Sequence, residues 1–435
     1  MSSFFEIAYA IVAGRLCLFT GTGFSKAITN NKAPGWQKLL EGCCDLLDNG
    51  NEIKNELFPT GGKSPLSLEE SAQVIDIELN KAGKNIHDEV AKLIGNVHLD
   101  GDNAIIEEFV KSHQLRVITT NYDKLIESFA EQGKAHSISL GMPVPRSTVP
   151  LEVYHIHGSV DLPQHMVVTS DDYFKFINTN SYHAKKLSTV LHENTVVFLG
   201  YSLGDTNLKS IISDYRDFSR NQAAGGNIFF ISKDAVSQLV KDYYSHCYGI
   251  RVIDNMPVHD FFEKVENQIE NAEERFEKSL NNLQKVLNDG REFKDDYLRL
   301  ENSFFEILSS VHAQGKSVNA PAVIAMLGKI ITKKVALTGE NDAWEQYVHL
   351  AKWLVHLGCK VDIGATNIKE QYLLAVGHSM SSMSKRLIIG RSWHAYKAWN
   401  AGWFDITPAN RKMIRNHIEE KLAYEDDALY VVQRS

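Results

Sequence analysis

Three polar side chains stand where they could act together on a substrate: Asn121, Asp123 and His157. Asn121 and Asp123 follow a short β-branched run at 116–120, and His157 closes a strand expected at 153–157. The carboxyl ends of parallel strands face the ligand crevice of an open sheet, so we expect Asn121 and Asp123 to lie there. A neutral imidazole in the same crevice is a competent base near pH 7.

A glycine turn follows the first apolar run of the chain. The run predicts a buried strand, and Gly21-Thr22-Gly23-Phe24-Ser25 predicts a tight turn into a helix. Free N–H groups at such a helix start point at an anion, which makes the turn a candidate phosphate site. A plain strand-to-helix corner has the same pattern, so both interpretations stay open. A second turn of this kind, Gly200-Tyr201-Ser202, follows the strand expected at 195–199.

Each of these signals also has a structural interpretation. Asn121 or Asp123 can simply cap the next helix. His155 and His157 alternate along a strand, but a metal site needs a further ligand and none is evident nearby. His155 can equally be a hydrogen-bonded core histidine. Trp36 can wall a nucleotide pocket or pack on the sheet.

The elements around these residues predict an α/β fold with a parallel sheet over about the first 250 residues, because continuous apolar strands alternate there with helices. Residues 3–14 predict a short helix. Residues 51–65, which contain Gly61 and Gly62, predict a surface loop, and 66–113 predict a run of helices.

The pattern becomes mainly α-helical after residue 257. A single long amphipathic helix is expected, either as a packing face or as an oligomer seam; its apolar positions are Phe262, Val265, Ile269, Ala272, Phe276, Leu280, Leu283 and Leu287. Further helices are expected at 321–335 and 344–357. An aromatic cluster is expected to lie in the core: Trp393, Tyr396, Trp399, Trp403 and Phe404. The predicted domains are 1–256 and 257–435.

Composition narrows the class of protein. The chain has 435 residues, 43% hydrophobic residues and a formal net charge of −8, which argues against general electrostatic binding of nucleic acid. The N-terminal stretch lacks a signal-peptide pattern, and no apolar run of ~18 residues predicts a membrane span. We therefore expect a cytoplasmic protein with no membrane contact and no direct sequence-specific nucleic acid binding.

The four strand ends together resemble the sirtuin superfamily. Residues 21–25 resemble its Gly-Ala-Gly-x-Ser turn, 119–123 its Thr-Gln-Asn-x-Asp motif, His157-Gly158 its catalytic His-Gly and 200–202 its second Gly-x-Ser turn. They occur in family order over residues 15–235, about half the chain. The resemblance implies a Rossmann-like domain that binds NAD and breaks the nicotinamide–ribose bond.

Departures from the family motifs qualify this resemblance. The zinc ribbon of protein deacetylases is absent, Thr120 replaces the family Gln, and Pro34-Gly35-Trp36 stands in place of their arginine-bearing cofactor loop. These changes are similar to the sirtuin-like NADases of bacterial antiphage systems, which hydrolyse NAD when phage is sensed and halt the infected cell. The Thoeris effector carries a second α/β domain, whereas the helical second half here looks more like the large-oligomer subunit that works with a HerA-type ATPase.

On this resemblance, the chain is a NAD+ glycohydrolase of antiphage defence, with NAD as its substrate. Asn121 and His157 are the implied catalytic residues: Asn121 holds the ribose and the attacking water, and His157 acts as base. The implied NAD-binding residues are Gly21, Thr22, Gly23, Phe24, Ser25, Asp123, Gly200, Tyr201 and Ser202, with Asp123 on the carboxamide. The alternatives are a protein deacylase or ADP-ribosyltransferase, or a catalytically silent NAD-binding or ADP-ribose-binding subunit.

We predict that the purified protein holds no stoichiometric zinc. Its five cysteines form no Cys-x-x-Cys pair, and Cys43 and Cys44 are too closely spaced for a zinc knuckle. Chelators should leave stability and NAD cleavage unchanged, and no peptide deacylation should be detected. Elemental analysis that found one tightly held zinc per chain would contradict this prediction and favour the deacylase.

Overall fold

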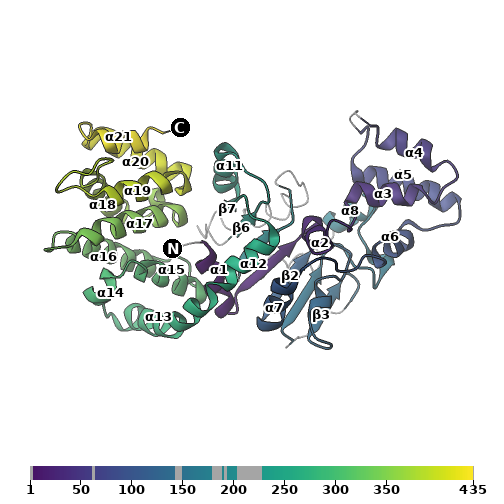
Figure 1. Cartoon of the computed structure of the whole chain (residues 1–435), viewed down its shortest axis with the longest axis horizontal. Coiled ribbons are helices and arrows are strands. Elements are labelled where there is room, and N and C mark those ends of the chain that lie inside the picture. The colour runs from purple at the N-terminus through teal and green to yellow at the C-terminus, as the bar shows by residue number, and fades with distance from the viewer. Residues whose placement is uncertain are drawn as a thin grey trace.

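A parallel β-sheet is the central element of the molecule (Figure 1). The computed structural model describes residues 3–60, 64–142, 149–178, 189–190, 194–202 and 228–434. Within these ranges the strand order is β3-β4-β2-β1-β5-β6-β7, and every neighbouring pair is parallel. The strands are β1 (Leu16–Thr20), β2 (Leu115–Thr119), β3 (Ala135–Ser139), β4 (Leu151–His155), β5 (Thr195–Leu199), β6 (Ile228–Ile231) and β7 (Ile250–Ile253).

The two faces of the sheet explain why β1, β5 and β6 are almost entirely apolar. In β1, Leu16 and Leu18 join one buried cluster, whereas Cys17 and Phe19 join another on the opposite face. Successive side chains of a strand alternate between faces, so a strand covered on both sides has no solvent-facing position. The helices packed around the sheet are α1 (Ser3–Val12), α2 (Thr22–Ile28), α7 (Ala104–Ser112), α11 (Gln238–Tyr248) and α12 (Val258–Glu266).

The topology places a ligand crevice next to β1. From β1 the chain moves to β2 on one side of the sheet and returns to β5 on the other side of β1. In doubly wound sheets, ligands bind outside the carboxyl ends of the strands at such a reversal. The predicted α/β fold with a parallel sheet and a mainly helical C-terminal part is thus confirmed.

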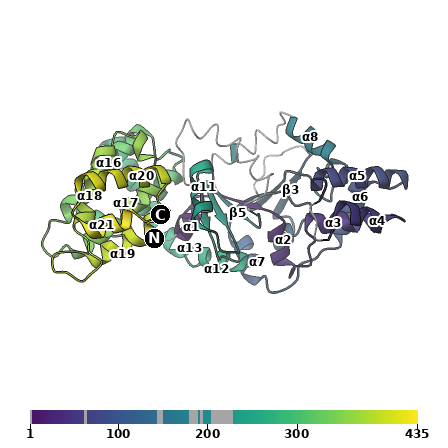
Figure 2. The same cartoon turned by 90° about the horizontal axis from the view of Figure 1, so that it is seen from above.

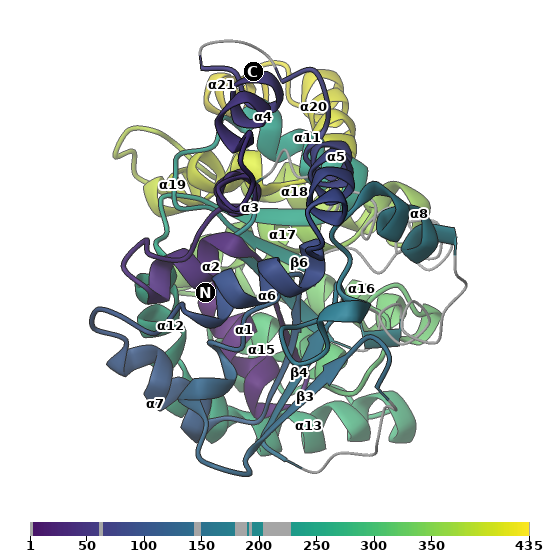
Figure 3. The same cartoon turned by 90° about the vertical axis from the view of Figure 1, so that its right-hand side faces the viewer.

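A separate group of helices lies beyond one end of the sheet, and Figure 3 views the molecule from this side. It comprises α3 (Trp36–Cys44), α4 (Gly50–Leu57), α5 (Leu68–Lys81), α6 (Ile86–Gly95) and α8 (Ser170–Asn178). The predicted loop at 51–65 is wrong over α4, because Ile53 and Leu57 have helical spacing and are buried against neighbouring helices. Gly61 and Gly62, which contributed to that prediction, lie outside the described residues.

The C-terminal helices lie on the other side of the sheet, as Figure 2 shows from above. They are α13 (Ile269–Asp289), α14 (Asp295–Arg299), α15 (Ser303–Ala313), α16 (Pro321–Leu337), α17 (Trp344–Lys360), α18 (Lys369–Ser381), α19 (Trp393–Gly402), α20 (Pro408–Lys421) and α21 (Asp426–Val432). Among the helices that the structure describes, none combines the length and apolar character of a membrane span. Trp399 and Trp403 are fully buried, as predicted for the aromatic cluster, and Tyr396 and Phe404 pack against the same core. Trp393, which was expected in this cluster, is only half-buried.

The prediction of a single long helix from Phe262 to Leu287 is wrong in one respect. It is divided into α12 and α13 by a tight turn at residues 267–268, where the Gln268 N–H donates to the Val265 carbonyl. The apolar spacing continues across this turn, which is why periodicity alone did not reveal it. α12 and the first residues of α13 pack in the same cluster as the sheet, whereas Leu283 packs with the C-terminal helices.

Glu6 of α1 joins the sheet to the C-terminal helices through ion pairs that are mostly shielded from solvent. Glu6 accepts a 2.8 Å hydrogen bond from Arg251 of β7 and forms an ion pair with Lys360 of α17. Burial alone would raise the pKa of Glu6, but these two cations hold that pKa well below its usual range. Tyr9, also on α1, bonds to Ser310 of α15 at 2.7 Å.

We predict that Phe262→Ala lowers the free energy of unfolding by about 3–5 kcal/mol, as is typical for deletion of a buried aromatic ring. Phe262 is fully buried, and its ring centroid lies 4.8 Å from that of Phe109 and 6.4 Å from that of Phe24. Urea denaturation would measure the loss. The matched control is Phe174→Ala, because Phe174 is 65% exposed. Equal effects of the two substitutions would contradict the packing described here.

Candidate active site

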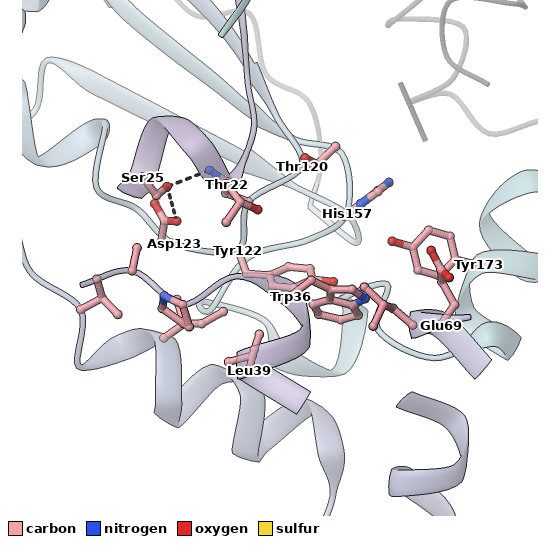
Figure 4. Close-up of a pocket in the computed structure, with 16 residues that line it drawn as sticks. Thr22, Ser25, Trp36, Leu39, Glu69, Thr120, Tyr122, Asp123, His157 and Tyr173 are labelled. Carbon is pink, nitrogen blue, oxygen red and sulfur yellow. Dashed lines mark hydrogen bonds between the residues drawn. The ribbon is translucent and has the colours of Figure 1, made fainter. Parts of the chain in front are cut away.

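A cavity of about 330 Å³ lies where the carboxyl ends of β1, β2 and β4 meet the helices around α3 (Figure 4). It is lined by five of the predicted catalytic and NAD-binding residues: Thr22, Ser25, Asn121, Asp123 and His157. They come from three separate stretches of the chain. The sheet therefore brings these distant motifs to one place.

A hydrogen-bond chain links α2 to the end of β2. The Ser25 hydroxyl donates to Asp123 Oδ2 at 2.7 Å and accepts from Asn121 Nδ2 at 2.8 Å. Asp123 Oδ1 also accepts from the Leu125 N–H at 3.2 Å. Burial raises the pKa of Asp123, and the hydrogen bond from Ser25 opposes part of that rise. Asp123 therefore does more than cap the next turn, because it also anchors Ser25.

The backbone around His157 holds its imidazole at the cavity. The His157 carbonyl accepts from the Val167 N–H at 2.8 Å. Gly158 has φ +83°, and a Cβ there would lie 2.7 Å from the Met166 Cα, so the turn after His157 requires glycine. His157 is 4% exposed, and its ring packs edge-on against that of Tyr173 with the centroids 5.4 Å apart.

Burial also sets the charge of His157. It lowers the pKa of His157 to about 4, because a buried imidazole without a compensating anion disfavours the charged form. The ring is therefore neutral over the physiological range and keeps a lone pair that can accept a proton. Among the described residues, no hydrogen bond to this imidazole is found, so its ring nitrogens are not committed to protein partners there.

His155 does not line this cavity. Its Nε2 lies 2.7 Å from Glu127 Oε1 and its Nδ1 lies 3.0 Å from the Asn121 carbonyl oxygen. It is thus the hydrogen-bonded core histidine that was one of the two interpretations of the sequence. Within the part of the chain that the structure describes, no group of three or more His, Cys, Asp or Glu side chains is arranged to hold a metal ion.

The glycine turn after β1 packs against the turn after β5. The Gly23 N–H donates to the Gly200 carbonyl at 2.8 Å, and the Gly21 N–H donates to the Leu199 carbonyl at 2.9 Å. A Cβ on Gly23 would lie 2.9 Å from the Gly200 Cα. The prediction that free N–H groups here face an anion is therefore wrong for Gly21 and Gly23, whose N–H groups already have backbone partners.

The remaining predicted NAD-binding residues do not line the cavity. Phe24 is 2% exposed and packs in the core against Phe262. Tyr201 holds the neighbouring turns together, since its hydroxyl lies 2.8 Å from Thr120 Oγ1 and donates to the Thr20 carbonyl at 3.0 Å. Ser202 is exposed, and Gly200 packs on Gly23. Their role in binding NAD stays a prediction.

Helices outside the sheet, and the segment after α6, complete the cavity with residues that sequence reasoning missed: Leu39, Leu68, Glu69, Ile94, Val97 and Tyr173. No local pattern marks them, because their neighbours in the cavity are distant in sequence. Trp36, which was expected either to wall a pocket or to pack on the sheet, does wall the cavity. Its ring centroid lies 5.9 Å from that of Tyr122, and its buried Nε1 has no hydrogen-bond partner among the described residues.

The fold and this cavity agree with a match to a known domain. Residues 115–253 match the family model of the SIR2-like domain. That segment runs from β2 to β7 and includes Asn121, Asp123 and His157.

Individual relatives are also found. Over 256 residues the chain is 27% identical to defense-associated sirtuin 2 of Bacillus subtilis, and this alignment covers 57% of the chain and 24% of that protein. It is 36% identical over 112 residues to the NAD(+) hydrolase ThsA of Bacillus cereus (strain MSX-D12), covering 24% of the chain and 23% of the relative. It is 24% identical over 246 residues to ThsA of Cytobacillus dafuensis, covering 54% and 46%. The aligned part of the chain thus spans less than half the length of each of these relatives.

We predict that Gly200→Ala destabilises the protein by about 1–3 kcal/mol more than Gly290→Ala, the usual cost of overpacking. Both glycines have positive φ, at +75° and +67°, so both substitutions strain the backbone. A Cβ on Gly200 would lie 2.0 Å from the Phe24 nitrogen, whereas one on Gly290 meets nothing within 4 Å. Denaturant unfolding of the two variants measures the difference. Equal losses would show that the close approach of the two turns is not required.

Proposed function

We propose that this protein is a NAD+ glycohydrolase that releases nicotinamide and ADP-ribose. The observation that carries the proposal is the meeting of Ser25, Asn121, Asp123 and His157 at one cavity. The match to the SIR2-like domain and the relatives named NAD(+) hydrolase support it. NAD is then the substrate.

The reaction requires positioning more than strong acid catalysis. The bond between the ribose C1′ and the nicotinamide nitrogen breaks, its electron pair goes to that nitrogen, and nicotinamide leaves as a neutral base. A water oxygen bonds to C1′, and the water gives up one proton. The sugar passes through an oxocarbenium-like state, which oriented dipoles in a dry site can stabilise.

The hydrogen bonds of Asn121 orient its amide for this work. Asp123 Oδ2 accepts from the Ser25 hydroxyl. Since that hydroxyl proton is committed to Asp123, the Ser25 oxygen accepts from Asn121 Nδ2. The amide oxygen of Asn121 therefore remains an acceptor, and we propose that it holds a ribose hydroxyl or the attacking water.

His157 and Asp123 take the other two roles. We propose that the neutral His157 ring accepts the proton of a ribose hydroxyl or of the attacking water. The lowered pKa of His157, about 4, keeps the ring in the base form at neutral pH. Asp123 would accept from the nicotinamide carboxamide. In this proposal Thr22, Ser25 and the turn at 200–202 help hold the rest of NAD.

We further propose a role in antiphage defence by NAD depletion. The name of the Bacillus subtilis relative, defense-associated sirtuin 2, supports this role. In this proposal residues 1–256 bind and cleave NAD, and residues 257–435 assemble an oligomer or dock a partner such as a HerA-type ATPase. We place the activity in the cytoplasm, where the proposed substrate is abundant.

We predict that Asn121→Ala and His157→Ala each abolish NAD cleavage without unfolding the protein. Removing a general base typically costs ~10²–10⁴ in rate, so the loss should be large. Chromatographic detection of nicotinamide and ADP-ribose from NAD alone measures it. Asn281→Ala and His394→Ala are matched controls, because both residues are exposed and lie on α13 and α19.

The same assay separates the alternative functions. Wild-type turnover in folded Asn121→Ala or His157→Ala protein would overturn the site assignment. Activity that appears only with an acylated peptide or a protein acceptor would favour a deacylase or ADP-ribosyltransferase. Tight NAD binding by the wild type with no turnover, alone or with a partner ATPase, would favour a silent binding subunit.

A further inference from the structure

A buried histidine and carboxylate lie directly behind the cavity. They are His155 of β4 and Glu127 of the 3₁₀ helix η1 (Glu127–Phe129), whose side chains are 0% and 9% exposed. His155 Nε2 lies 2.7 Å from Glu127 Oε1. The other carboxylate oxygen, Oε2, is buried without a hydrogen-bond partner in the described residues. The imidazole is thus the hydrogen-bond partner of this carboxylate.

The second contact of His155 reaches Asn121. His155 Nδ1 lies 3.0 Å from the Asn121 main-chain carbonyl oxygen, which can only accept a hydrogen bond. Each of the two contacts, Nδ1 to the Asn121 oxygen and Nε2 to the Glu127 oxygen, needs a proton to be a hydrogen bond, whereas a neutral imidazole has only one N–H. One additional proton shared by His155 and Glu127 satisfies both contacts, and whichever of the two carries it, Nδ1–H donates to Asn121.

Asn121 is consequently held at three atoms. Its main-chain N–H donates to Thr119 Oγ1 at 3.1 Å, and its side-chain Nδ2 donates to Ser25 at 2.8 Å. His155 holds the third atom, the carbonyl oxygen. The Thr119 hydroxyl is itself fixed because it donates to the Thr20 carbonyl at 3.0 Å. With these anchors in place, the direction of the Asn121 amide depends on His155 as well as on Ser25.

We propose that His155 and Glu127 are positioning residues that clamp the Asn121 main chain through a shared proton. Their catalytic consequence rests on the proposed function, because it requires Asn121 to act on NAD. Neither residue touches the cavity. The clamp itself is a property of the fold and is testable without NAD.

The charges around His155 favour the shared proton. Burial alone would lower the pKa of His155, but the hydrogen bond and charge of Glu127 outweigh it, so the pKa is raised. The other carboxylate facing the ring is that of Asp123. The residues beside His155 on the adjacent strands are Thr119 of β2 and Ser139 of β3, and neither side chain titrates.

Glu127→Gln separates the clamp from the shared proton. A glutamine amide can donate to Nε2, which leaves the single imidazole proton on Nδ1 facing Asn121. This variant should keep the clamp at every pH. Glu127→Ala removes the group that fixes the His155 tautomer. The imidazole proton can then sit on Nε2, which leaves the lone pair of Nδ1 facing the Asn121 carbonyl oxygen.

The stability of wild type and Glu127→Gln should therefore diverge with pH. The folded-state pKa of His155 lies above its unfolded value, so its contribution is fully present below about pH 6.5 and is lost as the pH rises through the raised pKa. Urea unfolding of the full chain at several pH values should show that the free energy of unfolding of the wild type falls relative to that of Glu127→Gln as the pH rises above about 6.5. A pH-independent difference between the two would overturn the shared proton.

Turnover tests the positioning role. Glu127→Ala should lower kcat by about 10²-fold with little change in KM, the scale of a misplaced catalytic group, and Glu127→Gln should restore most of it. Glu266→Gln is the matched control, because Glu266 pairs with His113 at 2.9 Å just before β2, at the amino edge of the sheet opposite the cavity. It should retain wild-type kcat and its pH profile.

The outcomes separate the two proposals. A Glu127→Ala variant with wild-type kcat, or a folded Glu127→Gln variant as inactive as Glu127→Ala, would overturn the positioning role. If wild type never releases nicotinamide, the proposed function fails instead, and the stability comparison still decides whether the shared proton exists.

Discussion

The contact between the backbones of Gly23 and Gly200 is the constraint on which the site depends. The Gly23 N–H bonds to the Gly200 carbonyl, and neither position has room for a Cβ. This close backbone contact fixes the start of α2 between the ends of β1 and β5, and therefore also fixes the position of Ser25. Ser25 in turn anchors Asn121 and Asp123. The turn at residues 21–25, which was a candidate phosphate site in the sequence, therefore packs the end of β1 against the end of β5.

A second constraint connects the sheet to the C-terminal helices. Glu6 on α1 forms ion pairs with Arg251 of β7 and Lys360 of α17, and all three side chains are mostly shielded from solvent. Such buried ions are costly alone and tolerable together, so removing one partner would leave the others uncompensated. α12 and α13 reinforce this link because their apolar residues continue from the sheet cluster toward the C-terminal cluster. A truncation near residue 256 would therefore also remove Phe261 and Phe262 from the core of the sheet.

Sequence patterns predicted the elements whose environment is local or uniform. Continuous apolar runs predicted β1, β5 and β6, because strands covered on both faces are apolar along their length. The expected strands at 116–120 and 153–157 correspond to β2 and β4, although each of these carries a charged residue, Arg116 or Glu152. Strand-end motifs predicted that Asn121, Asp123 and His157 meet. What the sequence did not reveal depends on packing between distant segments. Glu69 and Tyr173 reach the cavity from separate helices, and the N–H groups of the first glycine turn bond to carbonyls at the end of β5, far along the chain. Likewise, the break at 267–268 leaves the helical spacing unchanged.

The electrostatics of the cavity fit a reaction that relies on orientation. His157 is kept neutral by burial, whereas the proton shared between His155 and Glu127 stays behind the cavity wall. A base whose pKa is near 4 is always available but weak, which suits a step in which the leaving group departs before the water is fully deprotonated. In the proposed reaction the amide of Asn121, fixed by Ser25 and by its main-chain contacts, would supply the orientation that a stronger base could not replace.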